Sequence, residues 1–542
     1  MASALIKENN LPISSPEDFD RLFPDQIRPN ITYAEFLSEM PVLKNTNEFI
    51  EKIVNFDKKD PICICGDYDS DGIMATVIML YTFSELGYNI HFDIPNRLTD
   101  GYGISLNKIE DDIKKYGTKL FITVDTGITS RNELDKIKEN YDVDFVITDH
   151  HLPDNEQVPN TLIIDPKYNL DEFSDICGAH VALKLCYALI SSMAPDRLGI
   201  IETLIPLAGI ATVADMMPVL EENRQLIRLT LDAINAAKYS GGSYLFKIIQ
   251  SLGGSNFIKN PTAIATEELI SFSIAPAINA VSRVNGDVSD LVKKLLECLK
   301  RPWVYMPSYI NWNIIRQRMT SELWKKFNND FDKNSTAHSV VYLYNNEDYK
   351  NNIKGILGLI ANKISNKYKI VSLAGSMKDD KIVEFSGCSV PNYSLHDGIM
   401  RIKEAHPEFE LGGGGHSQAM GIHLLYEKLD DFKIALEEDI IANSPPYDPV
   451  IFEYEPEMEN EIMSTIEELQ PYGQGFKCLK FKYTGIFLSY DYENKIAIIS
   501  DYKFKMFISQ DEIDDLIGTD IDVIFTISYS SSEGPIFSVM KE

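Results

Sequence analysis

Apolar runs alternate with amphipathic runs over the first half of the chain. The short apolar runs, which predict strands, lie at residues 61–65, 119–125, 144–149 and 161–166. The amphipathic runs, which predict helices, lie at residues 72–87, 130–141 and 178–192. Strands that alternate with helices of this length are typical of βαβ units, so the pattern predicts an α/β domain with a parallel sheet.

The rest of the chain changes pattern several times. Its 542 residues exceed what one hydrophobic core organises, so several domains are expected. Helical periodicity dominates the segment after the α/β domain, a second α/β pattern follows, and short β-like runs make up the tail. That tail predicts a small β-barrel of the OB type. The predicted units are a mostly helical lead-in (1–58), the catalytic α/β domain (59–217), a helical connector (218–335), a second α/β domain (336–445) and the OB-like domain (446–542).

Composition narrows the class of protein. A hydrophobic content of 44% with 24% charged residues is typical of a globular protein. No apolar run reaches the roughly 18 residues that cross a bilayer, and the first residues lack the apolar core of a secretory signal. We therefore expect a cytoplasmic protein with no membrane partner. The seven cysteines include one close pair, Cys63 and Cys65, with no second pair at zinc spacing. Reduced, mostly buried thiols are expected rather than a zinc site.

The net charge of −30 limits how a polyanion could be bound. Nucleic-acid-binding proteins usually carry a basic surface, and an acidic protein repels polyanions at long range. A nucleic-acid substrate would therefore be held locally, by metal ions and a small number of arginine, lysine and histidine side chains.

Three predicted strands run directly into clusters of polar residues. The clusters are Gly66-Asp67-Tyr68-Asp69-Ser70-Asp71-Gly72, Asp125-Thr126-Gly127 and Asp149-His150-His151. Active sites in open parallel sheets form outside the carboxyl ends of the strands. One such cluster alone could be a capped turn, but three at successive strand ends predict a shared site. The alternate spacing of Asp67, Asp69 and Asp71 suggests an extended strand end with these side chains on one face.

So many carboxylates in one crevice would repel one another unless cations neutralise them. Oxygen ligands combined with imidazole suit Mn²⁺, Mg²⁺ or zinc better than they suit soft metals. Two divalent ions close together can activate a water molecule and screen the charge of an in-line displacement at phosphorus. The clusters therefore predict a phosphodiesterase with two Mn²⁺ or Mg²⁺ ions.

These residues resemble the DHH phosphoesterases in their RecJ form. The three strand-end clusters resemble the first three motifs of that family. The later matches, in family order, are residues 211–218 for the fourth motif, 276–283 for RecJ's Asn-Ala-x-Gly-Arg segment, 413–421 for the Gly-Gly-His signature of the DHH-associated domain, and 471–475 for the segment that opens RecJ's OB domain. The ordered set, across roughly residues 60–480, is far more specific than any single motif.

The resemblance implies a ligand set for each ion. Asp67, Asp69 and Asp125 would hold one ion, with Asp125 bridging to the other. The second ion would be held by Asp71, Asp125, His150 and Asp215. The implied catalytic residues are Asp69, Asp71, Asp125, His150, His151 and Asp215. Asp149 would orient an imidazole, as metal-bound histidines generally require.

The resemblance also implies contacts to phosphate or DNA. The residues concerned are His151, Asn279, Arg283, Gly414, Gly415 and His416. Glycines let the backbone approach a phosphate and present N–H groups to it. The alternatives are a surface ion pair for Arg283 and a plain glycine-rich turn around His416.

Three positions depart from the RecJ pattern. Cys65 stands where many relatives carry histidine, and Cys388 lies in a Ser-Gly-Cys-Ser run where RecJ proteins usually have arginine. Phe476-Lys477 replaces the expected Asn-Pro. Cys65 replaces a metal ligand of those relatives, Cys388 replaces a phosphate contact, and Phe476-Lys477 changes the segment that leads into the tail.

The activity that the resemblance implies is 5′-to-3′ exonuclease action on single-stranded DNA, releasing 5′-mononucleotides in DNA repair or recombination. A DHH phosphodiesterase acting on short oligonucleotides or cyclic dinucleotides is the alternative enzyme. A non-catalytic replication or repair scaffold is a further alternative, which the intact acids disfavour. The tail carries 7 basic and 19 acidic residues, a net of −12. It could therefore dock a single-strand-binding protein or another replication or repair protein instead of DNA.

Overall fold

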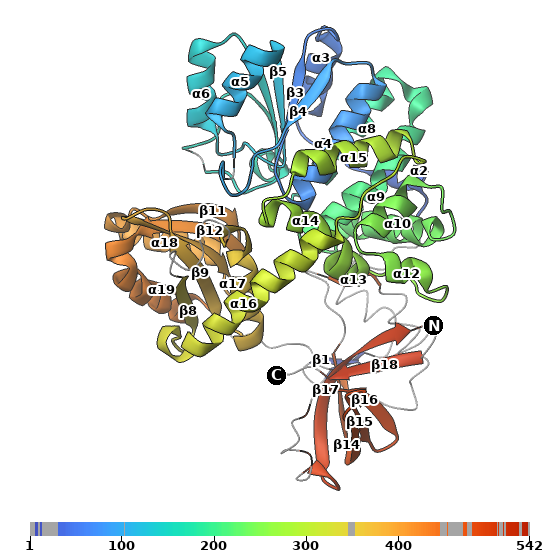
Figure 1. Cartoon of the computed structure of the whole chain (residues 1–542), viewed down its shortest axis with the longest axis vertical. Helices are drawn as coiled ribbons and strands as arrows, with labels where there is room; N and C mark the ends of the chain where they lie inside the picture. The colour runs from blue at the N-terminus through green and yellow to red at the C-terminus, as the bar shows by residue number, and fades with distance from the viewer. Residues whose placement is uncertain are drawn as a thin grey trace.

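The computed structural model describes most of the chain, and Figure 1 shows its arrangement. The described residues are 6–8, 11–13, 31–101, 103–154, 156–344, 353–444, 452–453, 470–473, 480–506, 508, 513, 516–530 and 534–539. An α/β body with attached helices, a second α/β body and a β body follow one another along the chain. The long helix α16 (Ile310–Asn334) runs from the first body to the second (Figure 1). Gln474 and Gly475, which end the segment that resembles the opening of RecJ's OB domain, and the replacement at Phe476-Lys477 lie outside the described residues.

The first sheet confirms the predicted parallel α/β fold. Its strands, all parallel and in the order β4-β3-β5-β6-β7, are β3 (Ile62–Gly66), β4 (Ile90–Asp93), β5 (Leu120–Val124), β6 (Asp144–Thr148) and β7 (Leu162–Ile164). The sequence reading missed β4, which is only half-buried and mixes polar with apolar residues. Because the strand order reverses between β3 and β5, a crevice is expected at the carboxyl ends of these two strands.

Helices cover both faces of this sheet. Helices α4 (Ser70–Glu85) and α8 (Gly178–Met193) lie on one face, and α5 (Leu106–Tyr116) and α6 (Arg131–Asn140) on the other (Figure 1). Strand β3 accordingly sends Ile62 and Ile64 into one core and Cys63 and Cys65 into the other. Burial on both faces explains why these strands read as continuous apolar runs.

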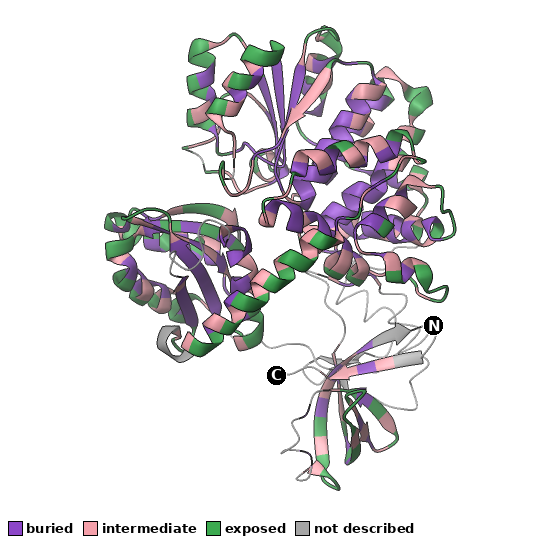
Figure 2. Ribbon diagram, in the orientation of Figure 1, coloured by how far each residue is buried: buried purple, intermediate pink, exposed green. Residues whose placement is uncertain are grey.

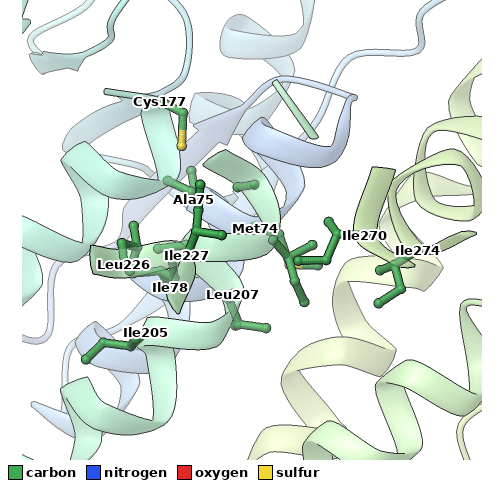
Figure 3. Close-up of a cluster of buried hydrophobic side chains, with 14 of the residues drawn as sticks. Met74, Ala75, Ile78, Cys177, Ile205, Leu207, Leu226, Ile227, Ile270 and Ile274 are labelled. Carbon is green, nitrogen blue, oxygen red and sulfur yellow. The ribbon is translucent and has the colours of Figure 1, made fainter. Parts of the chain in front are cut away.

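The predicted helical connector packs directly on the first body. Its elements are α9 (Gly199–Ala214), α10 (Glu221–Ala237), α11 (Tyr244–Ser251), α12 (Ser255–Lys259), α13 (Glu267–Leu269), a π-helical turn η2 (Ile270–Ile274), α14 (Ala275–Arg283) and α15 (Val288–Lys300). Figure 3 shows Met74 and Ile78 of α4 gathered with Leu207, Ile227 and Ile270 from these helices. Each such side chain contributes about 1.5–3 kcal/mol on full burial. The connector thus shares the core of the first body, and α4, α8 and α9 are buried along most of their length (Figure 2).

The second α/β body is built on a mostly antiparallel sheet. Its strands, in the order β11-β12-β10-β9-β8, are β8 (Ser339–Tyr344), β9 (Val371–Met377), β10 (Ile382–Cys388), β11 (Gly412–His416) and β12 (Ala419–Leu425). Only β8 and β9 pair in parallel. Helices α17 (Leu357–Tyr368), α18 (Leu395–Ala405) and α19 (Leu429–Asn443) pack on the sheet. The glycine-rich strand β11 forms one edge of it.

The tail forms a sheet that closes on itself. Its strands are β13 (Phe452–Glu453), β14 (Lys480–Asp491), β15 (Ile496–Ile499), β16 (Tyr502–Lys505), β17 (Asp520–Ser530) and β18 (Gly534–Val539). The order β14-β15-β16-β18-β17 returns to β14 through the β14–β17 pairing, and β16 runs parallel to β18. A closed five-stranded order agrees with the OB-type prediction, which stays a prediction. Phe504, Phe525 and Phe537 are buried inside this sheet.

The N-terminal segment contains strands that the sequence reading did not predict. Strand β1 (Ile6–Glu8) pairs antiparallel with β2 (Leu11–Ile13). Helices α2 (Tyr33–Glu39) and α3 (Thr46–Asn55) follow, and Thr32 with Glu35 forms a capping box at the start of α2. Within the residues that the structure describes, no helix combines the length and apolarity needed to cross a bilayer. The predicted domain boundaries stay predictions.

Candidate metal centre

The first acidic cluster lies in the turn that joins β3 to α4. Asp69 caps α4, its Oδ1 accepting hydrogen bonds from the backbone N–H groups of Asp71 (2.9 Å) and Gly72 (3.2 Å). Strand β3 ends at Gly66, and Asp71 lies in the first turn of the helix. The expected extended strand end was therefore wrong, because a helix begins within the cluster. A Cβ at Gly72 would lie 2.5 Å from the carbonyl oxygen of Asp67, so this tight turn requires glycine.

The other predicted ligands reach the same place from separate elements. Asp125 directly follows β5 in the left-handed region (φ 60°), which is unusual for a residue with a side chain. His150 follows β6, and Asp215 is the C-cap of α9. The Nε2 atom of His150 lies 3.1 Å from Asp125 Oδ1, 3.5 Å from Asp71 Oδ2 and 3.6 Å from Asp215 Oδ2. The structure thus brings residues of the first four motifs together.

Donor atoms in this crevice fall into three groups, within each of which they lie no more than 4.8 Å apart. The groups are Asp67 with Asp69 and Asp125, Asp71 with His150 and Asp215, and Asp125 with His150 and His151. The first group is the ligand set that the resemblance implies for one ion, and the second contains three of the four residues implied for the other. Asp125 belongs to the first group, and its Oδ1 lies 3.1 Å from His150 Nε2 of the second, while its role as a bridging ligand stays a prediction.

The charge state of the crevice fits divalent cations. Burial, followed by neighbouring carboxylates, raises the pKa of Asp125 and Asp215 well above the ordinary range, and raises that of Asp71 to about 6. Burial and Asp69 likewise raise the pKa of Asp67. Among the described residues, no hydrogen bond reaches the buried Oδ1 of Asp67 or the buried Oδ2 of Asp215. The carboxylates of the crevice thus need positive charge to neutralise them. Carboxylate oxygens together with imidazole nitrogens are ligands that suit Mn²⁺ or Mg²⁺.

The N-terminus of helix α8 holds two of the acids in place. Asp71 accepts hydrogen bonds from the backbone N–H groups of Gly178 (2.6 Å) and Ala179 (2.7 Å). The positive end of the helix dipole favours a carboxylate there. A Cβ at Gly178 would lie 2.5 Å from the Cβ of Asp125. Gly178 therefore lets the helix approach both ligands.

Asp149 orients His151 rather than His150. Its Oδ1 accepts a hydrogen bond from His151 Nδ1 at 2.8 Å, and its Oδ2 accepts one from the backbone N–H of Ile128 at 2.9 Å. Burial raises the pKa of Asp149, but His151 and the backbone donors outweigh this, so the pKa is lowered overall. Burial opposes the charge on His151, yet Asp149 and nearby carboxylates raise its pKa to about 9. His151 is therefore a cation at neutral pH, which suits it to contact a phosphate oxygen.

Two predicted phosphate contacts belong to helix α14, Asn279 beside the acidic turn and Arg283 at the junction with the second body. Asn279 Oδ1 accepts hydrogen bonds from the backbone N–H (2.8 Å) and hydroxyl (3.1 Å) of Ser70, so it steadies the acidic turn. Arg283 Nη1 donates to the carbonyl of Gly355 at 2.9 Å. Burial, followed by Arg97, lowers the pKa of Arg283 to about 9. A Cβ at Gly355 would lie 2.2 Å from the carbonyl oxygen of Arg283, so the two bodies meet here backbone to backbone.

The glycines of β11 have different structural roles. Gly413 (φ 153°) and Gly415 (φ 146°) have conformations that favour glycine, and a Cβ at either would collide with β12. A Cβ at Gly414 would meet nothing within 4 Å. The backbone of His416 belongs to β11, and its side chain lies outside the described part. Phosphate binding by these residues stays a prediction.

Sequence reasoning missed two charged residues near the centre. The Arg97 guanidinium lies 4.7 Å from the ring centroid of Tyr68 and partly offsets the rise that burial and Asp69 cause in the pKa of Asp67. Asp165 follows β7, caps α7 (Pro166–Asn169) and has a pKa raised to about 7 by burial and by Asp149. The rule that found the first three clusters, applied to the fourth strand, would have found Asp165. Arg97 follows the unpredicted strand β4.

Two departures from the family pattern have clear positions. Cys65 is buried on the face of β3 that packs against α5 and α6. Cys388, at the end of β10, is half-buried, and Asn362 Nδ2 donates a hydrogen bond to its Sγ at 3.6 Å.

Comparisons with known proteins agree with this geometry. Residues 61–211 match the family model described as the DHH family, N-terminal domain. The single-stranded-DNA-specific exonuclease RecJ of Bacillus subtilis (strain 168) is 28% identical over 407 residues, which are 74% of this chain and 48% of the relative. RecJ of Salmonella typhimurium is 27% identical over 462 residues, covering 80% of this chain and 77% of the relative. The chain thus spans about half of the first relative's length.

Solved structures show the same fold. The crystal structure of RecJ from Thermus thermophilus in complex with Mn²⁺ superposes with a TM-score of 0.73 at 21% identity, covering 95% of this chain and 73% of that chain. Another exonuclease RecJ bound to manganese gives a TM-score of 0.54 at 25% identity, covering 75% of this chain and 96% of that chain. Residues 61–211 thus match the DHH family, and the chain as a whole resembles RecJ in sequence and in fold.

Proposed function

We propose that this chain is an exonuclease that requires two divalent cations and degrades single-stranded DNA from its 5′ end, releasing 5′-mononucleotides. The observation that carries the proposal is the convergence of two donor groups, Asp67 with Asp69 and Asp125 and Asp71 with His150 and Asp215, in one crevice. The RecJ relatives are named single-stranded-DNA-specific exonucleases, which supports single-stranded DNA as the substrate of this chain. The manganese-bound RecJ structures support Mn²⁺ as a cofactor.

In this proposal the acids and histidines divide the work. When bound, the cations supply activation of a water molecule and screening of charge at phosphorus. Asp67, Asp69 and Asp125 hold one of them, and Asp71, His150, Asp215 and the shared Asp125 hold the other. His151, protonated beside Asp149, donates to a non-bridging phosphate oxygen.

Binding of the DNA strand is assigned to residues on the other side of the crevice. Arg283, at the junction of the two bodies, and the glycine strand β11 would contact phosphates of the incoming strand. Arg97, beside Asp67, adds a third positive group. So small a set of cations agrees with the net charge of −30, because binding is then local rather than spread over a basic surface.

We also propose a cytoplasmic location, where its DNA substrate is found, and a protein partner for the tail. The tail's 19 acidic against 7 basic residues favour a partner with a basic surface, such as a replication or repair protein, over a DNA strand. A single-strand-binding protein is the first candidate to test.

The test uses purified full-length protein with Mn²⁺ and single strands labelled at either end. Early release of the 5′ label as a mononucleotide, abolished by a chelator and restored by Mn²⁺, is the expected result. A blunt duplex of the same sequence is the matched control and should be degraded poorly. Early release of the 3′ label would overturn the polarity. Cleavage limited to di- or trinucleotides would favour a short-oligonucleotide phosphodiesterase, and full activity in excess chelator would refute the metal-dependent mechanism.

A further inference from the structure

A second cluster of metal-ligating side chains lies in the first body, apart from the acid centre. One donor atom each from Cys63, His91 and Asp112 lies within 4.8 Å of the other two. Cys63 is fully buried and Asp112 is 8% exposed, while His91 is half-buried. The three residues come from β3, β4 and α5, and none of them belongs to the groups around Asp125.

Strand register explains how these residues meet. Cys63 pairs with His91 in the parallel ladder of β3 and β4, so both side chains project to the same face of the sheet. That face is the one covered by α5, which places Asp112 over the pair. Cys65 lies two residues further along the same face, with its Sγ 3.7 Å from the Sγ of Cys63. Two thiolates on one tetrahedral zinc ion, with Zn–S bonds of about 2.3 Å, lie about 3.8 Å apart.

We propose that Cys63, His91 and Asp112 bind one thiophilic divalent cation, with Zn²⁺ as the natural occupant and Cys65 as an additional sulfur donor. The donor set of thiolate, imidazole and carboxylate is typical of zinc and differs from the oxygen-rich acid centre. One thiolate and one carboxylate carry two negative charges, which a divalent cation neutralises. The sequence reading expected no zinc here because the histidine and the aspartate lie far from the cysteines along the chain.

The hydrogen bonds in the cluster show what the cation would replace. His91 Nε2 lies 2.9 Å from both carboxylate oxygens of Asp112 and 3.2 Å from the hydroxyl of Thr118. The cation would take the place of the proton that His91 shares with Asp112. The Cys63 thiol would lose its proton to solvent, since thiolate is the metal-binding form. The hydrogen bond with Cys65, together with burial, raises the pKa of Cys63, so the thiol stays protonated without a cation.

Cys63 belongs to β3, so the cluster is connected to the acid centre through that strand. Strand β3 leads directly into the turn of Asp67–Asp71. A cation that links β3 to β4 and α5 would therefore stabilise the position of that turn.

The simpler alternative is a structural hydrogen bond between His91 and Asp112 with two inert thiols beside it. A Co²⁺ titration of the full-length protein separates the two possibilities. The protein is stripped with a chelator and then given excess Mg²⁺, which fills the oxygen-rich centre. Only a thiolate ligand gives Co²⁺ a near-ultraviolet charge-transfer band, so the acid centre does not contribute. We expect one equivalent of Co²⁺ to give this band and Zn²⁺ to displace it.

The variants assign the band to the cluster. The double variant C63A/C65A, which removes both sulfur donors, should lose it, and H91A should bind Co²⁺ at least about tenfold more weakly. C186A is the matched control, because Cys186 is a fully buried thiol packed on Met79, away from the cluster. C186A and the acid-centre variant D125N should both keep the band. Absence of the band in the wild type, its persistence in folded C63A/C65A, or a wild-type Co²⁺ affinity in H91A would overturn the proposal.

Discussion

The chain contains two five-stranded α/β sheets that use their strands in opposite ways. In the first sheet every strand is parallel, so all carboxyl ends meet at one edge, and the loops after β3, β5 and β6 deliver acids and histidines to a single crevice. In the second sheet most neighbours are antiparallel, so strand ends alternate and no edge collects them. What the second sheet offers is a glycine-rich edge strand, β11. The parallel sheet brings side chains from several strand ends together, whereas the edge strand of the second sheet exposes backbone groups.

The two regions also differ in how firmly their groups are held. In the first, Asp71 is fixed by α8, His151 by Asp149, and the turn at Ser70 by Asn279. In the second, Gly414 has open space where a side chain would lie. On the proposed function, the first region performs the chemistry and the second contacts the strand. Substitutions should therefore separate loss of metal from loss of substrate binding.

The largest expected effect is that of D125A. Removing the carboxylate that the proposal assigns to both ions should lower the cleavage rate by about 10³-fold or more, since metal assistance is worth several kcal/mol. The fold should persist, because relief of carboxylate repulsion offsets the lost ligand. Single-turnover rates with saturating Mn²⁺ measure the effect, and circular dichroism checks the fold. A variant with near wild-type rate would remove Asp125 from the mechanism.

G178A should act on the same region without touching a ligand. The added Cβ would press on Asp125, so Mn²⁺ affinity should fall by about 10- to 100-fold, the range for residues that support metal ligands. G199A is the matched control, because Gly199 is also the first residue of a helix and has open space around its Cα. Calorimetric titration of both variants with Mn²⁺ compares them. Equal affinities would mean that α8 does not position Asp125.

The complementary test of the second region is R283A. Loss of a charge-assisted contact worth about 1.5–3 kcal/mol should raise KM about 10- to 100-fold while leaving Mn²⁺ affinity unchanged. G414A should have a smaller effect in the same direction, because its methyl group would obstruct a phosphate but not the fold. Steady-state kinetics on one oligonucleotide measures both. Loss of bound Mn²⁺ in either variant would contradict the division between the two regions.

The smallest effect concerns pH and stability. The folded-state pKa of Asp71 is raised to about 6. Protonation of Asp71 therefore stabilises the metal-free folded protein at low pH, and this stabilisation is lost as the pH rises through 6. Mn²⁺ binds the deprotonated carboxylate of Asp71, so bound Mn²⁺ offsets the stability that the metal-free protein loses at higher pH. The increase in Tm caused by Mn²⁺ should therefore be larger at pH 7.5 than at pH 5. Thermal melts with Mn²⁺ or with chelator give the comparison, and D125A should lose the difference.

The sequence predicted the parts of the molecule that follow from local pattern. Continuous apolar strands followed by polar clusters led to the parallel sheet and to Asp71, Asp125 and His150 in one place, whereas Asp215, at the end of helix α9, came from the family resemblance alone. Strand β4 was missed because a short, half-buried strand has no clear pattern, and Arg97 was missed with it. The pairing of Asp149 with His151 rather than His150 depends on side-chain direction, which spacing along the chain does not determine.

The central claim is that two divalent cations bind around Asp125. Counting Mn²⁺ by calorimetry and recording its electron paramagnetic resonance spectrum on the same sample tests this most directly. Two equivalents with an exchange-coupled spectrum are expected, because two ions that share one carboxylate lie close enough to couple. D125A should bind fewer ions and lose the coupling. A wild-type protein that binds a single, uncoupled Mn²⁺ ion would contradict the account.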